Sequence, residues 1–519
     1  MSIFALSNEL VDNILSYLDT HTLFQVALVS KDLNALATPY LYREVEFGNP
    51  FPEWGHKFLL PFAYLIFTKP SIASHVYSFS LQGGMDWGEM PPAEEMAGLE
   101  RDDSHRRLSW PESPDLDDTL HRVVREAAHS DDEAEEWYGV VREGNWESSV
   151  LALVLPKLLK LRRLFVQAEE CEHGYFRQIF ERVRDRQKPF NSGEAFAELT
   201  DVMVDGWGDK YPSEPYIFNA CLGMPSLQRI YGNNLGYNDS SEPEDVDIKL
   251  QLNSLPITEI ELRNTKLLGA ELVQMLRACK RLTAFIYEAG QAWAWTPLRF
   301  SDIRLALTPH EAWLERLCLD HPAFYPYESP QDGEDEPWAI SFKDFKVLKQ
   351  LRVAPVYLFG HYSLRDPDPA NPQDDVDEDR LIGQLLEAMP PTLEELHITH
   401  SEFIFSVNHL APAFNALIVE KDERVPELKK LTFEGPFKSQ RTWLDRSECF
   451  HRLQTLLQVA EAKGITTVVL DDPDDYGGEE RGWGWERNVQ WPECQSNQKG
   501  AMTVLSRSDI VILAAQDSW

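Results

Sequence analysis

Three aspartates at alternate positions, Asp375, Asp377 and Asp379, imitate the start of a calcium site in this sequence. Such a loop also requires a glycine at its sixth position and a glutamate at its twelfth. Arg380 and Leu386 stand in these two places. We therefore exclude an EF-hand loop and expect no bound metal.

The sequence also lacks the short motifs that position a nucleophile or a cofactor. GxSxG, GxxxxGK, GxGxxG and HExxH are all absent, although these are the patterns that expose a serine, cradle phosphates or pair two histidines. The 14 histidines show no ligand spacing, and we expect His397 and His400, beside a predicted strand, to form hydrogen bonds. We therefore expect no cofactor and predict that the chain is not an enzyme.

The cysteines and the apolar runs indicate where the protein resides. Six cysteines lie tens of residues apart without a CxxC pair, which favours neither a disulfide scaffold nor a zinc site. The first positive side chain is Lys31, so we expect no secretory signal. The longest apolar run, residues 58–67, contains Pro61 and is about half of what a membrane helix needs. We expect reduced thiols and a cytoplasmic or nuclear protein.

Charge is distributed unevenly along the 519 residues. The 49 basic and 85 acidic side chains give a formal net charge of -36, which argues against binding to nucleic acid or to an anionic membrane. The whole acidic excess lies in five segments, residues 85–147, 239–247, 325–337, 366–379 and 471–480. Proline, glycine and serine gather in these segments, so we predict acidic inserts between parts of a neutral framework.

One apolar pattern recurs through the framework: apolar, two variable residues, apolar, one variable residue, apolar. Its full copies begin at residues 161, 199, 257, 314, 348, 393, 428 and 465, and weaker copies begin at 76, 227 and 282. The last two apolar positions of each copy predict a short strand with one buried face. In the copy at 393, for example, Leu396 and Ile398 should point inward and His397 should not.

Between the copies the apolar period becomes helical. Leu272, Leu276 and Cys279 share a face in residues 269–281, and similar faces occur in 380–389 and 451–463. A strand–helix unit cannot bury its own apolar face, so such units must stack. The short LxxLxL core resembles that of leucine-rich repeats and implies an irregular α/β solenoid with acidic insert loops. The alternative is an ordinary α/β domain whose strands share a motif.

The first fifty residues have a different, wholly helical pattern. Ser7 is placed to cap a helix over residues 8–18, a second short helix follows Thr20, and a third is kinked or ended near Pro39. The first of these helices carries a wide apolar stripe. Three helices in about forty residues form a core too small to be stable alone. We expect this module to bury part of its surface against a partner or the following domain.

This helical stretch resembles an F-box of the kind found in fungal F-box proteins. The resemblance rests on Leu6, Glu9, Leu10, Ile14, Leu18, Leu23, Val29, Ser30, Lys31, Leu36, Ala37, Leu41, Tyr42 and Arg43. One departure is Ser7, where the family usually has a proline. The resemblance implies docking onto a Skp-type adaptor that joins a cullin scaffold in a ubiquitin ligase, with a downstream domain that captures the target.

The residues that this resemblance assigns to adaptor binding are Leu6, Leu10, Ile14, Leu15, Leu18, Leu23, Val29, Ser30, Lys31, Leu36, Leu41 and Tyr42. The implied function is a substrate-recognition subunit of a Skp–cullin–F-box ubiquitin ligase that recruits a protein target for ubiquitination. Two alternatives stay open. One is a leucine-rich-repeat interaction scaffold outside any ligase, and the other is an enzyme on an α/β fold.

The domain organisation follows from these patterns. We predict an F-box-like domain over 1–50, a connecting helix and first strand over 51–84, an acidic insert over 85–147 and a repeat domain over 148–519. Loops at corresponding places in a solenoid line up along one edge, so the inserts would favour a basic target. The candidate target-binding residues are Asp374, Asp375, Asp377, Glu378 and Asp379.

Overall fold

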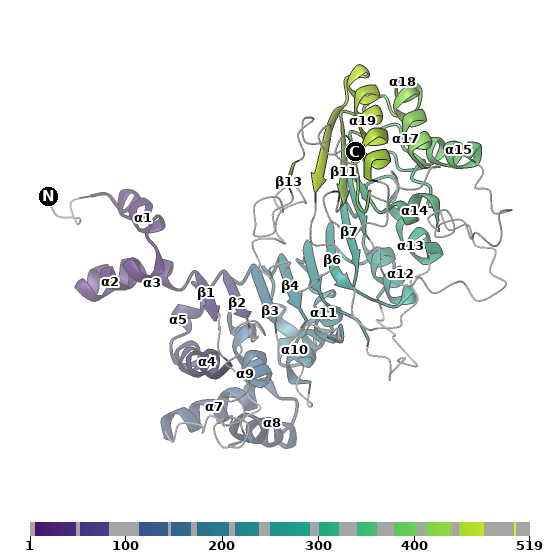
Figure 1. Ribbon diagram of the computed structural model, residues 1–519. Helices are drawn as coiled ribbons and strands as arrows, with labels where there is room; N and C mark the ends of the chain where they lie inside the picture. The colour runs from purple at the N-terminus through teal and green to yellow at the C-terminus, as the bar shows by residue number, and fades with distance from the viewer. Residues whose placement is uncertain are drawn as a thin grey trace, which may run out of the picture. The chain divides into compact units, whose positions relative to one another are not determined.

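The structure is a computed structural model that describes most of the chain. The described residues are 6–47, 52–82, 114–143, 147–167, 174–206, 213–237, 250–290, 300–320, 340–360, 378–401, 410–435, 437, 446–471 and 503–504. They divide into two compact units. Unit 1 comprises Met1–Trp207 and Ser213–Gly232, and unit 2 comprises Gly208–Pro212 and Asn233–Trp519. Figure 1 shows the helices and strands of both.

Unit 1 begins with the three expected helices, α1 (Asn8–Ser16), α2 (Thr20–Val29) and α3 (Lys31–Leu41). Asp19 caps α2 by accepting a hydrogen bond from the Thr22 backbone N–H at 2.7 Å, and Ser30 caps α3 by accepting one from Leu33 at 3.2 Å. These caps satisfy donors that a helix start leaves free. Pro39 lies inside α3, which continues to Leu41.

Five strands of unit 1 then follow in sequence order: β1 (Glu44–Phe47), β2 (Ser78–Gln82), β3 (Arg163–Gln167), β4 (Asp201–Asp205) and β5 (Arg229–Asn233). The pairs from β1 to β4 are parallel. The connecting helices are α4 (Pro52–Thr68), α5 (Pro70–Ala73), α7 (Pro114–Ala127), α8 (Asp131–Glu143), α9 (Glu147–Val154), α10 (Tyr175–Arg184) and α11 (Tyr216–Cys221).

Helices occupy part of the segment that the charge pattern assigned to an acidic insert. Within residues 85–147, α7 and α8 bury one apolar face and leave most of their carboxylates exposed, whereas Glu133 pairs with the buried Arg182. Trp137 of α8 is fully buried and stacks on Tyr175 of α10, with ring centroids 4.5 Å apart. High charge density here marks the solvent face of a helical pair, whereas we had expected a loop.

Unit 2 repeats the strand–helix pattern. Its strands are β6 (Glu259–Thr265), β7 (Ala284–Ala289), β8 (Arg316–Asp320), β9 (Gln350–Val353), β10 (Glu395–Ile398), β11 (Lys430–Gly435), β12 (Thr466–Asp471) and β13 (Thr503–Val504). Neighbours from β6 to β12 pair in parallel, and β13 is antiparallel to β12. The connecting helices are α12 (Gly269–Ala278), α13 (Phe300–Leu307), α14 (Pro355–Phe359), α15 (Glu378–Ala388), α17 (Leu410–Val419), α18 (Lys421–Arg424) and α19 (Arg446–Ala462).

The recurring apolar pattern sets the register of this sheet. Each of the eleven copies coincides with a strand, from β2 to β12. The second apolar residues pair from strand to strand, as Leu351, Leu396 and Leu431 do in β9, β10 and β11. Leu396 and Ile398 are fully buried, as predicted. In Figure 1 the helices of unit 2 lie along one side of the strands, and Phe433 of β11 packs on Phe414 of α17 at 6.0 Å.

Strand β12 departs from the predicted register by one residue. The pattern predicts that Val468 and Leu470 point inward, but Val469 pairs with the inward Phe433 and is 3% exposed. Val468 and Leu470 are half-buried. Three consecutive apolar residues do not alternate, so they cannot specify which face is buried.

Candidate functional site

The three N-terminal helices share a small apolar core. It consists of Val11, Leu15, Leu23, Ala27 and Ala37. Partly buried apolar side chains pack around it, namely Leu6, Leu18, Val26, Leu36, Tyr40 and Leu41. The Asn34 side chain also donates to the Ala27 carbonyl at 3.3 Å and ties α3 to α2. Five buried residues are few for an independent fold, so each of them matters for stability.

The same helices expose an unusual number of large apolar side chains. Six of the eleven exposed large apolar residues in the described ranges lie between positions 10 and 29, namely Leu10, Ile14, Tyr17, Phe24, Leu28 and Val29. Those on α1 recur at helical spacing and form one stripe, and those on α2 form another. We call these six residues the apolar stripes. Their exposed fractions reach 72% at Val29 and 83% at Tyr17. Such a concentration marks a surface that another molecule covers.

The predicted adaptor-binding residues fall into two groups. Leu10, Ile14 and Val29 are exposed and available to a partner, and so is Lys31. The buried or partly buried ones support the helices themselves: Leu6, Leu15, Leu18, Leu23, Leu36, Leu41 and Tyr42. Ser30 is half-buried and caps α3.

Sequence reasoning missed Tyr17, Phe24 and Leu28. Ile14 follows Leu10 by four residues and Tyr17 follows Ile14 by three, and Leu28 follows Phe24 by four. This spacing could have revealed both stripes. The sequence does not show which apolar face of a short helix is core, because both faces carry large side chains.

Local electrostatics stabilise the starts of these helices. The Thr22 backbone N–H and hydroxyl lower the pKa of the Asp19 carboxyl, and Glu9 has its pKa lowered by its own backbone N–H and by the Ser7 hydroxyl. Ser7 occupies the N-cap position of α1, but its side chain forms no capping hydrogen bond to the backbone. Two ionised carboxylates therefore complement the positive ends of α1 and α2 at neutral pH.

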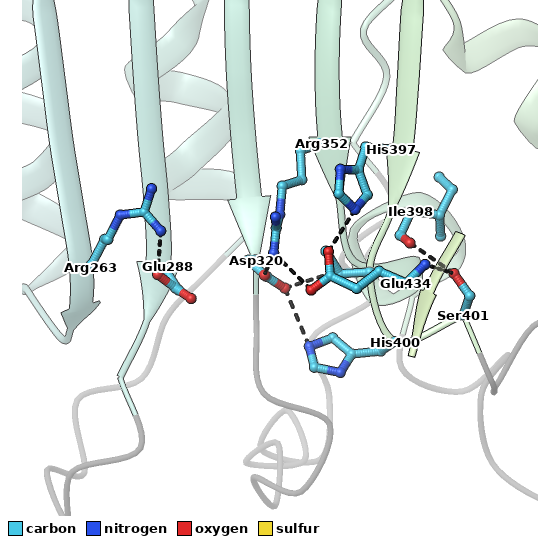
Figure 2. Close-up of polar contacts among 10 residues, drawn as sticks. Arg263, Glu288, Asp320, Arg352, His397, Ile398, His400, Ser401 and Glu434 are labelled. Atoms are coloured by element: carbon cyan, nitrogen blue, oxygen red, sulfur yellow. Dashed lines mark hydrogen bonds and ion pairs between the residues drawn. The ribbon is translucent and has the colours of Figure 1, made fainter. Parts of the chain in front are cut away.

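Unit 2 contains a second cluster of interest, on the face of the sheet opposite the inward apolar positions (Figure 2). We call Asp320, Arg352, His397, His400 and Glu434 the ionic cluster. One nitrogen of Arg352, Nη2, donates to both Asp320 and Glu434 at 3.1 Å. His397 Nε2 lies 2.6 Å from Glu434 Oε2, and His400 Nε2 lies 3.3 Å from Asp320 Oδ1. The expected hydrogen-bonding role of both histidines is confirmed.

Further polar groups complete the cluster. Thr399 donates to the Asp320 carboxylate at 2.7 Å. The Ser401 hydroxyl accepts from the Glu434 backbone N–H at 3.1 Å and donates to the Ile398 carbonyl at 2.8 Å. The hydroxyl hydrogen is thus committed to a backbone carbonyl, which does not suit a nucleophile activated by a histidine.

Burial and charge together set the protonation of the ionic cluster. Burial alone would raise the pKa of Glu434, but Arg352 and His397 beside it lower that pKa to about 2. Burial lowers the pKa of His397 and the Arg352 cation lowers it further, so the imidazole is neutral at pH 7 and its N–H donates to Glu434. His400, Arg352 and Thr399 hold the pKa of Asp320 well below its usual range, against the opposing effect of burial.

A second ionic group lies on the same face, two strands away. Arg263 of β6 pairs with Glu261 and, at 3.3 Å, with Glu288 of β7. Two buried donors, Arg352 Nε and Arg263 Nη2, have no hydrogen-bond partner within the described part of the chain. In those same ranges no group of three or more histidine, cysteine or acidic side chains could hold a metal ion.

The acidic inserts lie mostly beyond the described residues. Asp374, Asp375 and Asp377 fall outside them, as do segments 239–247 and 325–337. Glu378 and Asp379 open helix α15 and are exposed. They are at the positive end of a helix, where carboxylates are stabilising.

Two remaining expectations concern the cysteines and membranes. Cys221, Cys279 and Cys318 are buried free thiols, as predicted. Burial raises the pKa of Cys279 to about 12, so this thiol is inert. Among the described residues, none of the helices combines the length and the apolar character that crossing a bilayer requires.

Comparison with known families agrees with the geometry of the N-terminal helices. Residues 8–47 match the F-box-like family, over the same span as α1, α2, α3 and β1. The search of curated proteins found no match to this chain. The chain therefore carries an F-box-like domain at residues 8–47, and its helices present the apolar stripes.

Proposed function

We propose that this protein is the substrate-recognition subunit of a Skp–cullin–F-box ubiquitin ligase. The F-box-like domain docks onto a Skp-type adaptor, and the strand–helix region of the rest of the chain recruits a protein target for ubiquitination. The chain itself performs no catalysis. Its buried free thiols are compatible with a reducing cytoplasm or nucleus.

The observation that carries this proposal is the coincidence of the F-box-like match with the apolar stripes. Leu10 and Ile14 lie on one face of α1, and Leu28 and Val29 lie on α2. Fully burying one large apolar side chain contributes about 1.5–3 kcal/mol. Several such side chains supply the apolar centre that a specific interface needs. The exposed Lys31 is placed to serve in its polar rim.

The fungal type of F-box protein and the leucine-rich-repeat-like solenoid are parts of the same proposal. The features that support the solenoid are strands in sequence order, helices between them and a copy of the apolar pattern on every strand from β2 to β12. Units that stack in this way create long surfaces for protein targets. A repeat protein without any ligase would share these features, and adaptor binding distinguishes the two.

The experiment is affinity purification of the full-length chain and of a variant without residues 1–50, followed by identification of the partners that disappear. We expect loss of a Skp-type adaptor and of its cullin, with retention of a target. A Leu10→Asp chain should lose the same partners, because a charge would have to be buried unpaired in an apolar contact. Leu252→Asp is the matched control, since Leu252 is 67% exposed in unit 2. Adaptor recovery that is equal for all four chains would contradict the proposal.

The acidic inserts form a separate part of the proposal. Their charge would favour a basic target and speed its capture. The test neutralises Asp374, Asp375, Asp377, Glu378 and Asp379 together and measures the association rate with the recovered target. A slower rate that depends less on salt supports the proposal. An unchanged rate would leave these residues with a role in solubility alone.

A further inference from the structure

Unit 1 contains a hollow at the amino ends of its first strands. Its volume is about 590 Å³, within the range of pockets that bind ligands. It is lined by Pro39, Tyr40, Arg43, Glu44, Tyr77, Arg162, Arg163, Thr200 and Asp201. We call it the arginine hollow. Three guanidinium groups in one hollow are notable in a chain whose net charge is -36, and none of the three arginines is among the residues proposed to contact the adaptor.

The backbone ladder fixes the spacing of the hollow's cations. The Tyr77 N–H donates to the Arg43 carbonyl at 2.9 Å, and the Arg162 N–H donates to the Tyr77 carbonyl at 2.9 Å. Tyr77 therefore lies between the two arginines on neighbouring chain segments. The Cζ atoms of Arg43 and Arg162 lie 6.0 and 5.4 Å from the centroid of its ring. A guanidinium over an aromatic face is held in place by the negative charge of that face.

The carboxylates around the hollow are already engaged. Glu44 pairs with Arg163 at 2.9 Å, and Asp201 pairs with Arg229. Glu198 accepts from Lys160 at 2.7 Å and from Arg162 at 3.2 Å. Burial raises the pKa of Tyr40, and a hydrogen bond with Asp12 of α1 raises it further.

Arg43 differs from the other two guanidiniums. It is exposed, and among the residues that the structure describes it pairs with no carboxylate; its aromatic neighbour is Tyr77. The side chains of Arg162 and Arg163 are 58% and 45% exposed, although each already pairs with a carboxylate. Both can therefore bind a further anion. The hollow therefore presents one uncompensated cation and two half-exposed ones.

We propose that the arginine hollow binds an acidic peptide segment of a partner protein. Neighbouring strands lie about 4.8 Å apart, so the backbones of Arg43 and Arg162 are separated by about 10 Å along the sheet edge. The lining of the hollow comes from four chain segments, residues 39–44, 77, 162–163 and 200–201, so an extended ligand can contact more of it than one small anion such as phosphate can. Alternate side chains of an extended peptide recur about 7 Å apart, and long arginine side chains can each meet one of two such carboxylates. Guanidinium–carboxylate pairs of this kind are short and charge-assisted.

The probe is a fluorescein-labelled peptide of alternating glutamate and serine, titrated with the full-length chain at 0.15 M salt. A peptide with glutamine in place of glutamate is the matched control. We expect saturable binding of the glutamate peptide and at least about tenfold weaker binding of the glutamine peptide. Arg43→Ala should weaken binding by about fivefold or more. Arg281→Ala provides the control protein, because Arg281 is an exposed arginine stacked 4.8 Å from the Trp313 ring in unit 2.

Three outcomes would overturn this inference. They are equal binding of the two peptides, an Arg43→Ala chain that binds like the unmodified one, and an Arg281→Ala chain that is weakened as much as Arg43→Ala. Displacement of the peptide by inorganic phosphate at concentrations where chloride is inert would instead identify a phosphate site. An Ile14→Asp chain should still bind the peptide, which keeps this test independent of adaptor binding.

Discussion

The N-terminal helices and the sheet of unit 2 differ in which side chains they bury. The helices bury six small or medium apolar residues, the five of their core and Leu33, and leave the six residues of the apolar stripes exposed. In unit 2, the inward apolar positions of β6 to β11 are almost wholly buried, and the other face also buries charged groups such as Asp320, Arg352 and Glu434. One region leaves apolar surface unburied, and the other buries even its ions.

This difference separates binding from stability. Apolar surface that is exposed to water stabilises the protein only when a partner covers it, and it then contributes to the free energy of binding. A buried ion pair adds little net stability, but removing one member leaves a charge without compensation. We therefore expect substitutions in the apolar stripes to change partner affinity and substitutions in the ionic cluster to change folding.

The largest effect should come from Arg352→Met, which leaves Asp320 and Glu434 buried without their shared cation. Breaking a buried pair in this way costs about 3–5 kcal/mol. Hydrogen exchange of the β9 to β11 amides measures the loss locally. Lys430→Met is the matched control, because Lys430 pairs with Glu395 where both are about one-third exposed, and it should cost at most about 1 kcal/mol. Equal effects would contradict the distinction between the two pairs.

A second substitution tests the inward face of the same sheet. Leu396 is fully buried in β10, and Leu396→Ala should destabilise this region by about 2–5 kcal/mol, since it removes apolar contacts and leaves a cavity. Glu395→Ala should stay within about 0.5 kcal/mol, because its neighbour Lys430 is half-buried and the pair is weak. Urea unfolding followed by tryptophan fluorescence and hydrogen exchange provides the measurement. A loss at Glu395 equal to that at Leu396 would overturn the register.

The ionic cluster also predicts how stability depends on pH. The folded pKa of His397 is lowered, so the unfolded chain takes up a proton below about pH 6.5 before the folded one does. The free energy of unfolding should therefore begin to fall as the pH drops below about 6.5. Glu434 has a folded pKa of about 2, so its contribution is complete above about pH 4.5 and is lost as the pH falls towards 2. Urea midpoints at pH 7.5, 5.5 and 3.5 measure this decline.

Two variants assign the decline to the cluster. His397→Gln should reduce the loss of stability that accompanies a fall in pH from 7.5 to 5.5. Glu434→Gln should reduce the loss between pH 5.5 and 3.5, and it should also lower the stability at pH 7.5. Glu395→Gln, on the same face and half-exposed, should leave the profile unchanged. A profile that is the same in all three variants would assign the pH dependence to other groups.

Local periodicity predicted many of the elements of this fold, but not all of them. The LxxLxL copies lie on strands β2 to β12, and helices α12, α15 and α19 occupy the predicted intervals. Gly464 ends the last of these at a φ of 70°, as its place before Ile465 indicates. Strand β1 was not predicted, since Glu44 and Glu46 place charge at the sheet edge, where a strand often does.

The ionic cluster could not be predicted from spacing. Arg352 and Glu434 are 82 residues apart in sequence, and Thr399 and Asp320 are 79 apart. Their proximity depends on the order of strands β8 to β11, which local patterns do not contain. The F-box-like helices were predictable because the residues of their apolar core all lie within positions 6–41. The resemblance assigned Leu15 and Leu23 to adaptor binding, but both belong to this core. Only the folded helices distinguish these two from the exposed Leu10 and Ile14.

The smallest effects on stability should occur in the apolar stripes. Tyr17 is 83% exposed, so Tyr17→Ser should change the midpoint of thermal unfolding by no more than the equivalent of about 0.5 kcal/mol. Circular dichroism of the full-length chain measures it. Leu15→Ala, in the core beside it, should cost about 2–5 kcal/mol of local stability. A large loss for Tyr17→Ser would show that this side chain supports the fold.

The most direct test of the separation between binding and stability is a titration of the full-length chain with a purified Skp-type adaptor. Ile14→Asp should abolish measurable binding and leave circular dichroism unchanged, because Ile14 is 42% exposed and outside the core. Leu252→Asp, a surface change of the same kind in unit 2, should bind as the unmodified chain does. Undiminished adaptor binding by a folded Ile14→Asp chain would contradict the assignment of the apolar stripes as a docking surface.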